Sequence, residues 1–306
     1  MRVNIMTSNT LHKQLVDEIN IIYYTSDSLF DQILYLIDNN YFVLANVPSS
    51  SENCRCITEL HMDMYDYDVC CSTNVVSYKD RSNLVSAMHI SDLYFEHHYR
   101  NSGLKKEDVY IINQNLRNSK KVFFNKFVAE SWGLNNSLVV EYGIPTNFFN
   151  INDSEPQKDV LILTSNNQSI AGQLQHHVMN NLKLKADCAE TLAFAKLEDI
   201  NKLFNDYKII VNLTNYTVNS LCAVSSGASV IALAQENPND VKLKGVPNLH
   251  NCLSVQDVAS KIDTVNKTHT KSDSANKYVN ENYNFDRFKS EMQGIFDTVK
   301  REAFVL

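Results

Sequence analysis

The segment SLCAVSSGASVIAL, residues 220–233, decides the fold class of this chain. Its first half is rich in small and apolar residues, with the density that is typical of a buried helix. Gly227 then interrupts the helical pattern, and Val230 to Leu233 form a short apolar run of the kind found in a buried strand. A helix that passes through a glycine into a strand is the repeating unit of α/β proteins. The segment alone leaves open whether this connection is structural or forms part of a ligand site.

Strand and helix patterns alternate along both halves of the chain. We expect strands at residues 2–6, 21–24, 41–47, 68–71, 88–95, 120–124, 138–141, 160–163, 182–186, 209–213 and 230–233. Helices are expected at residues 11–17 and 26–36, from Ile170 onward, at residues 192–197 and 218–225, after the segment 248–254, and at residues 285–304. Alternation of this kind predicts parallel sheets covered by helices. The polar segment 150–158 lacks periodicity and is the best candidate for a linker between two α/β halves.

The composition excludes several classes of protein. A chain of 306 residues with 44% hydrophobic and 21% charged residues is long enough for two soluble domains. A net charge of −7 argues against a protein that coats nucleic acid along its whole surface. The 7 irregularly spaced cysteines and the lack of a long apolar stretch indicate reduced thiols and a cytoplasmic protein without a membrane span. With only 7 glycines and no glycine-rich phosphate loop, any phosphate site must use helix N-termini, hydroxyls and amides.

Four segments resemble those of GT-B glycosyltransferases. KVFFNKFVAESWG (residues 121–133) and SLVVEYGIPTNFF (137–149) are similar to the pair that ends the N-terminal domain of that family. CAVSSGASVIAL (222–233) resembles the family segment "EAMAxGxPVIAs", and YVNENYNFDRFKSEMQGIF (278–296) resembles the closing turn and helix. The branch that these segments resemble is the retaining one, known as glycosyl transferases group 1.

This resemblance implies an α/β protein of the GT-B class, with two Rossmann-like domains that face each other across a cleft. It implies an N-terminal acceptor domain at residues 1–150, a nucleotide-sugar donor domain at 151–284, and a C-terminal helix at 285–306 that crosses back to the first domain. The chain departs from the family at three points. Thr214 and Cys222 replace the two glutamates of retaining members, and the loop Thr164 to Gln168 lacks the usual arginine and lysine.

The donor site is expected at two helix starts in the second half. Thr164, Ser165, Asn166 and Asn167 precede one helix, where hydroxyls, backbone amides and the helix dipole suit a diphosphate. Asn219 and Ser220 begin another helix and are expected to hold the same phosphates. The stretch from Thr214 to Cys222 is expected to line the nucleoside. An ordinary cluster of capping residues explains the same hydroxyls and amides equally well.

The first half holds candidates for catalysis and acceptor binding. Glu96 and His97 follow a strand-like run, where GT-B enzymes often place a histidine toward the transferred sugar; surface histidines are the alternative. A basic cluster offers an anionic acceptor a place to bind, although solvated helix ends have the same composition. Its residues are Lys105, Lys106, Arg117, Lys120 and Lys121, of which Lys105, Lys120 and Lys121 are the expected acceptor contacts.

Together these features predict a hexosyl- or pentosyltransferase that moves a sugar from a nucleotide-sugar, most simply a UDP-sugar, to a hydroxyl acceptor. The glycine-poor, Asn- and Tyr-rich composition is similar to that of viral or phage members, so the acceptor is expected to be a hydroxymethylated DNA base or a glycan. No metal and no other cofactor is expected. The alternative is a GT-B-like binding or regulatory subunit that has lost its donor contacts. A nucleotide-sugar epimerase would need a carboxylate pair in the second half, which the sequence lacks.

Overall fold

The computed structural model gives the chain two compact units, each described here by itself. The structure describes residues 21–24, 29–34, 36–37, 41–44, 55–57, 69–72, 86–90, 121–123, 137–164, 168–189, 196–214, 217–233, 243, 245–271 and 273–303. Unit 1 comprises Met1–Asp27, Asp31–Glu141 and Lys289–Leu306, and unit 2 comprises Ser28–Phe30 and Tyr142–Phe288.

Unit 1 contains a parallel sheet of seven strands. They are β1 (Ile21–Tyr24), β2 (Tyr41–Leu44), β3 (Arg55–Ile57), β4 (Val69–Ser72), β5 (Ser86–Ile90), β6 (Lys121–Phe123) and β7 (Ser137–Val139). Their order in space is β3-β2-β1-β4-β5-β6-β7, which extends the 3-2-1-4-5-6 order of the Rossmann fold by one strand. In register, Ile21 pairs with Tyr41 on one side and with Val69 on the other. Helix α2 (Leu29–Leu34) follows β1.

Unit 2 contains a second parallel sheet, with five strands. They are β8 (Lys158–Leu163), β9 (Ala186–Ala189), β10 (Tyr207–Asn212), β11 (Ser229–Leu233) and β12 (Leu249–Cys252). The order β12-β11-β10-β8-β9 is the 2-1-3-4-5 order of flavodoxin-like sheets. Strand order therefore reverses between β8 and β10, which pair along their length with Leu163 opposite Asn212.

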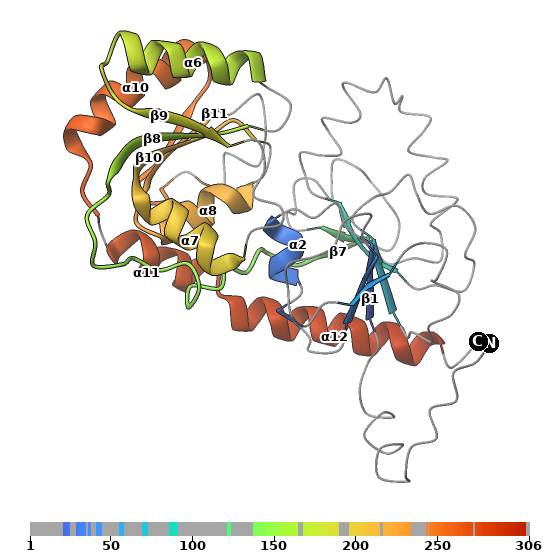
Figure 1. The fold of residues 1–306 in the computed structure, drawn as a ribbon. Helices are drawn as coiled ribbons and strands as arrows, with labels where there is room; N and C mark the ends of the chain where they lie inside the picture. The colour runs from blue at the N-terminus through green and yellow to red at the C-terminus, as the bar shows by residue number, and fades with distance from the viewer. Residues whose placement is uncertain are drawn as a thin grey trace. The chain divides into compact units, whose positions relative to one another are not determined.

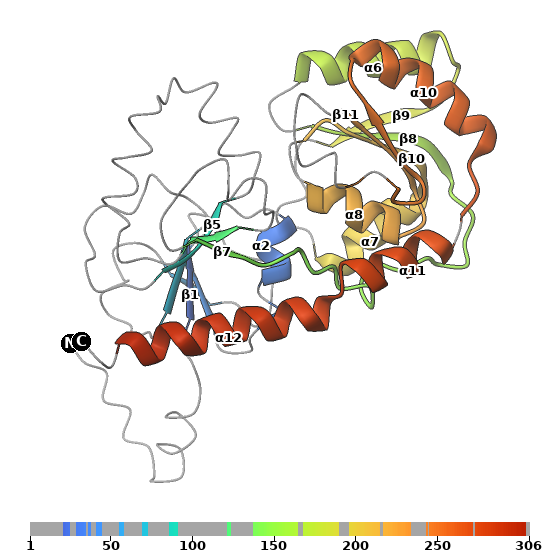
Figure 2. The ribbon, with the colours of Figure 1, turned by 180° about the vertical axis from the view of Figure 1, so that it is seen from behind.

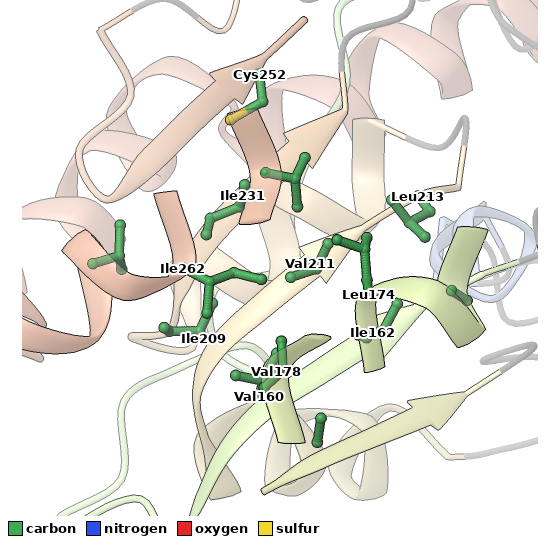
Figure 3. Close-up of a cluster of buried hydrophobic side chains, with 14 residues drawn as sticks. Val160, Ile162, Leu174, Val178, Ile209, Val211, Leu213, Ile231, Cys252 and Ile262 are labelled. Carbon is green, nitrogen blue, oxygen red and sulfur yellow. The ribbon is translucent and has the colours of Figure 1, made fainter. Parts of the chain in front are cut away.

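Helices cover both faces of this second sheet (Figures 1 and 2). α6 (Gln168–Asn180) and α10 (Val255–Thr268) pack on one face, and α7 (Leu197–Asp206) and α8 (Thr217–Ser225) pack on the other. Helix α11 (Asp273–Asn282) packs against α8. Figure 3 shows the core beneath α6 and α10, where Ile162, Val211 and Ile231 of three neighbouring strands meet Leu174 and Ile262 of the helices. Burying these branched side chains on a pleated surface is what stabilises the sheet.

The segment around Gly227 folds as its pattern predicts. Helix α8 ends at Ser225, and Gly227 adopts a left-handed conformation with φ of +90°. Ala228 N donates to Ala223 O at 3.2 Å and Gly227 N donates to Val224 O at 3.0 Å, which is the Schellman pattern of helix termination. The chain then enters β11, a strand that is almost entirely buried.

Most predicted strands are confirmed to within two or three residues over the described ranges, and parallel pairing is confirmed throughout. Five elements differ. Helix α7 runs from Leu197 to Asp206, beyond the helix expected at residues 192–197, of which only residues 196 and 197 are described. The strand expected at residues 182–186 begins only at Ala186, because Lys183 takes a positive φ that interrupts any strand there. Strands β3 and β12 and helix α11 were not predicted, because their short or polar sequences carry little periodic signal. The predicted strand 2–6 and helix 11–17 lie outside the described residues.

Two segments that carry the family resemblance lie side by side in unit 2. Ile144 N donates to Tyr283 O at 2.8 Å, and Ile144 forms a parallel β-bridge with Asn284. Arg287 Nη2 donates to Tyr142 O at 3.1 Å. Residues 142–149 and 283–288 are more than a hundred positions apart in the sequence, so these bonds join the two ends of the long segment that forms most of unit 2.

The polar segment that was expected as a linker lies within unit 2, where the side chains of Asn205 and Lys271 hold it. Asn205 is 2% exposed and its Nδ2 donates to Asn150 O at 2.9 Å, while its Oδ1 accepts from Asn152 N at 2.9 Å. Lys271 Nζ donates to Asn152 Oδ1 at 3.0 Å. Polarity in this segment therefore reflects a hydrogen-bonded attachment rather than a free connection.

Helix α12 (Phe285–Ala303) continues from this junction, with its residues from Lys289 onward grouped in unit 1. Gln293 Nε2 of this helix donates to Ile37 O at 3.2 Å within unit 1. Across the described residues, none of the helices combines the length and apolarity that crossing a membrane requires.

Candidate functional site at the carboxyl edge of the second sheet

The carboxyl ends of β8 and β10 define the candidate site. In open parallel sheets, ligands bind outside the carboxyl ends of the strands, at the point where strand order reverses. In unit 2 that point lies between β8, which ends at Leu163, and β10, which ends at Asn212. Leu213 N donates to Leu163 O at 2.9 Å, so the two strand ends stay paired up to the edge.

Thr164 is the first residue beyond β8, and its hydroxyl has no hydrogen-bond partner in the part of the chain that the structure describes. Its side chain is 2% exposed, and its Oγ1 has no hydrogen-bond partner among the residues described. Its backbone is held, because Thr164 N donates to Ala189 O at 2.9 Å. An unpaired buried hydroxyl costs about 1–3 kcal/mol. Such a group at a strand-order reversal is the kind of polar atom that a ligand satisfies.

A hydrogen-bond network of buried and half-buried side chains lies at the end of the neighbouring strand. Asn212 Nδ2 donates to Ser220 Oγ at 2.8 Å, and Asn212 Oδ1 accepts from Thr214 N at 3.0 Å and from Thr214 Oγ1 at 2.5 Å. Asn219 Nδ2 in turn donates to Thr214 Oγ1 at 3.0 Å. The network fixes the turn after β10 to the first turn of α8.

Thr164 and Asn212 lie on opposite faces of the sheet. Side chains alternate along a strand, so Thr164 lies on the face of Val160 and Ile162, beneath α6 and α10. Asn212 lies on the opposite face, where it meets Ser220 of α8. The two polar residues therefore flank the strand ends at the point of reversal.

The helices that follow these two strands differ electrostatically from the other helices of unit 2. Helices α7, α10 and α11 have acidic residues in their first turns, and α10 is also capped by Ser254, whose hydroxyl accepts from Asp257 N at 3.1 Å. Helices α6 and α8 have no acidic residue in their first turns. Their N-terminal partial positive charges are thus not offset by a local carboxylate, which favours an anion at this edge.

The structure places the predicted donor residues as follows. Thr214 is half-buried at the edge, whereas Asn219 and Ser220 are 6% and 1% exposed and belong to the network with Asn212. Cys222 is fully buried in the middle of α8, where burial raises the pKa of its thiol well above the ordinary value. It therefore stays a protonated thiol that packs with the core. Asn212 itself was not predicted, because an asparagine at a strand end resembles any turn residue in the sequence.

Of the other predicted site residues, the structure describes Lys121 alone. Ser165, Asn166, Asn167, Glu96, His97, Lys105 and Lys120 lie outside the described residues. Lys121 begins strand β6. Within the described part of the chain, no group of three or more His, Cys, Asp or Glu side chains is arranged to hold a metal ion.

Comparison with solved structures shows which proteins share this fold. The chain is similar to AviGT4, a glycosyltransferase involved in avilamycin A biosynthesis, with a TM-score of 0.58 and 8% identity over 93% of this chain and 99% of that one. It is similar to a glycosyltransferase from Rickettsia africae with the same TM-score of 0.58 and 11% identity, over 92% of this chain and 99% of that one. No protein-family model and no curated protein matches the sequence. At these identities the likeness establishes a shared fold.

Proposed function

We propose that this chain is a glycosyltransferase of the GT-B type that binds a nucleotide-sugar at the carboxyl edge of the sheet in unit 2. The observation that carries the proposal is buried Thr164 where strand order reverses, whose hydroxyl has no partner among the described residues, in a fold shared with glycosyltransferases. Residues 1–150 would then serve as the acceptor domain, residues 151–284 as the donor domain, and residues 285–306 as the returning helix.

In this proposal the donor diphosphate binds near the starts of α6 and α8. The loop at Thr164, Ser165, Asn166 and Asn167 supplies backbone amides and hydroxyls, and the helix dipoles stabilise the charge that develops on the leaving diphosphate. The network around Asn212 holds Thr214 and Asn219, which would lie beside the nucleoside. A UDP-sugar is the donor to test first, with no metal required.

Catalysis and acceptor binding are proposed for the first half of the chain. His97, or Glu96, would position the transferred sugar or assist removal of the acceptor proton. The cluster with Lys105, Lys120 and Lys121 would bind an anionic acceptor, for which a DNA duplex with hydroxymethylated bases is the candidate and a glycan the alternative.

A second candidate function is a nucleotide-binding subunit without transferase activity. The resemblance would place two glutamates at positions 214 and 222. The chain instead has Thr214, which carries no charge, and the buried Cys222, which stays protonated, and this favours a subunit without activity. The two functions differ in turnover. A transferase consumes the nucleotide-sugar in the presence of acceptor, whereas a binding subunit retains it unchanged.

The first experiment is a thermal-shift screen of the full chain against UDP, GDP, ADP and CMP and the corresponding nucleotide-sugars. A ligand at a hundred times its Kd adds about 2.7 kcal/mol to the free energy of unfolding, so a specific site gives a clear shift. We expect one nucleotide to stabilise the protein selectively. Release of the free nucleoside diphosphate, measured with and without hydroxymethylated DNA, then tests transfer.

Two isosteric variants locate the site. Thr164→Val removes the unsatisfied hydroxyl and should abolish most of the nucleotide shift. Thr268→Val makes the same chemical change on α10, where the hydroxyl donates to Thr264 O at 3.1 Å, and should leave the shift unchanged. If no nucleotide stabilises the wild-type chain, or if both variants respond as the wild type does, the proposed site is wrong.

A further inference from the structure

We infer that Asn212 is a positioning residue of the nucleotide site, acting through Thr214 and the first turn of α8; the inference rests on the proposed function. Asn212 is 3% exposed at the last position of β10. Three hydrogen bonds of its side chain lead to the candidate site: one to Thr214 N, one to Thr214 Oγ1 and one to Ser220 Oγ.

The direction of these bonds determines what Thr214 can offer a ligand. Asn212 Oδ1 is a pure acceptor, so Thr214 Oγ1 must donate its only proton to it. Asn219 Nδ2 donates to the same hydroxyl oxygen at 3.0 Å. With its proton used by Asn212, Thr214 cannot donate a hydrogen bond to a phosphate. Donation to the diphosphate must come from other groups, and one candidate is the hydroxyl of Thr164, which has no hydrogen-bond partner among the described residues.

Asn212 also fixes the start of α8 relative to the strand. Its Nδ2 donates to Ser220 Oγ at 2.8 Å between two buried side chains, and this bond joins the last residue of β10 to the first turn of the helix. The N-terminal amides of α8 are therefore held at a set position next to the strand ends, which is the condition for binding an anion with a helix N-terminus. Replacing the amide changes the position of both Thr214 and α8.

The most informative variant is Asn212→Asp. The carboxylate keeps the acceptor for Thr214 but loses the N–H that is donated to Ser220, and it adds a negative charge beside the proposed diphosphate. At about pH 8 the ionised carboxylate should weaken UDP binding at least about tenfold relative to the wild type. At about pH 5.5 partial protonation of this buried carboxyl should bring the ratio of the two Kd values back toward one.

Asn205→Asp is the matched control. Asn205 is also a buried asparagine, 2% exposed and bonded to backbone groups, but it lies just before the opposite, amino end of β10. The Asn205→Asp variant should be less stable than wild type, as Asn212→Asp is. Its Kd for UDP should stay close to the wild-type value at both pH values. A purely structural role for Asn212 would give a Kd ratio independent of pH.

A second pair of variants keeps the test valid if Asn212→Asp does not fold. Thr214→Val should weaken UDP binding about tenfold, whereas Thr214→Ser keeps the hydroxyl and should restore it. The role of Asn212 would be overturned if Thr214→Val bound UDP as tightly as the wild type. It would also be overturned if Asn212→Asp bound UDP as tightly as the wild type at both pH values. If wild type and Asn205→Asp both fail to bind UDP or any other nucleotide, the proposed function fails as well, and the two failures are thus distinct.

Discussion

Gly143 lies so close to Phe288 that no side chain fits between them. A Cβ atom on Gly143 would stand 2.2 Å from Phe288 Cβ and 2.7 Å from Phe288 Cγ. Both residues are buried in unit 2, where residues 142–149 run beside residues 283–288. Glycine is required at this position by close packing and not by its backbone conformation.

Gly143→Ala should therefore destabilise the protein by about 1–3 kcal/mol, because the methyl group forces Phe288 or the backbone to move. Gly172→Ala is the control: it lies on the exposed side of α6 with no atom within 4 Å of its Cβ position. Removing a glycine from that helix should stabilise it by about 0.5–1 kcal/mol. Denaturant unfolding of both variants measures the difference, and equal stability of Gly143→Ala and wild type would refute the contact.

Among the side chains that bond α11 to its surroundings, we expect Asn276 to contribute most to the stability of the protein. Its Nδ2 lies 3.1 Å from Phe149 O, 2.9 Å from Ser225 O and 2.9 Å from Ser225 Oγ. Asn276→Ala removes the donor to Ser225 O, while Phe149 O keeps its bond from Ser225 Oγ at 2.6 Å, and should cost about 1–3 kcal/mol of unfolding free energy.

Asn282→Ala is the control on the same helix. Asn282 Nδ2 donates only to Tyr278 O, at 2.8 Å, in an exposed position. Its loss should change stability by less than about 0.5 kcal/mol. Thermal unfolding that ranks the two variants in the reverse order would show that α11 is not fixed through Asn276.

Stability should fall as the pH drops below about 6.5, the ordinary pKa of a histidine. Burial lowers the pKa of His269, and the nearby Lys208 and Lys271 lower it further, against an opposing effect from Glu155. Burial also lowers the pKa of His250, with a contribution from Lys261. Below this pH the unfolded chain takes up protons that the folded chain takes up only at lower pH, so the free energy of unfolding decreases through that range.

His269→Gln should reduce this pH dependence. The ring Nδ1 of His269 lies 2.8 Å from Ser229 Oγ, so glutamine retains a polar partner for Ser229 but does not titrate. The measurement is the free energy of unfolding between about pH 7.5 and about pH 5.5 for both proteins. An unchanged slope in the variant would exclude His269 as a source of the acid sensitivity.

The sequence predicts the sheets better than the site, for a physical reason. Buried parallel strands such as residues 160–163 and 209–213 are continuous apolar runs, and the glycine after α8 marks a helix end that the structure confirms. The predicted linker 150–158 shows what local sequence patterns cannot predict. Its polar residues bond to Asn205 and Lys271, which are distant in sequence, and no local pattern encodes such partners.

The candidate site shows the same limit. Thr164, Thr214, Asn219 and Ser220 could be selected from the sequence because small polar residues flank apolar runs. The sequence could not predict their different roles. Whether a hydroxyl has a hydrogen-bond partner depends on the face of the sheet on which it lies. Asn212 bonds across to α8 whereas Thr164 lies on the opposite face, and this distinction exists only in the folded sheet.

The central claim is that Thr164 belongs to a nucleotide site. The most direct test is to measure the free energy of unfolding of wild type and of Thr164→Val. Each protein is measured with and without a saturating nucleotide that stabilises the wild type. A hydroxyl kept for a ligand is a cost in the free protein, so Thr164→Val should be more stable than wild type without nucleotide, by about 1 kcal/mol. With nucleotide the order should reverse, because the variant lacks the ligand contact. Two results would contradict a donor site at Thr164. In one, Thr164→Val is less stable than wild type without nucleotide. In the other, the nucleotide raises the free energy of unfolding of the variant as much as that of the wild type.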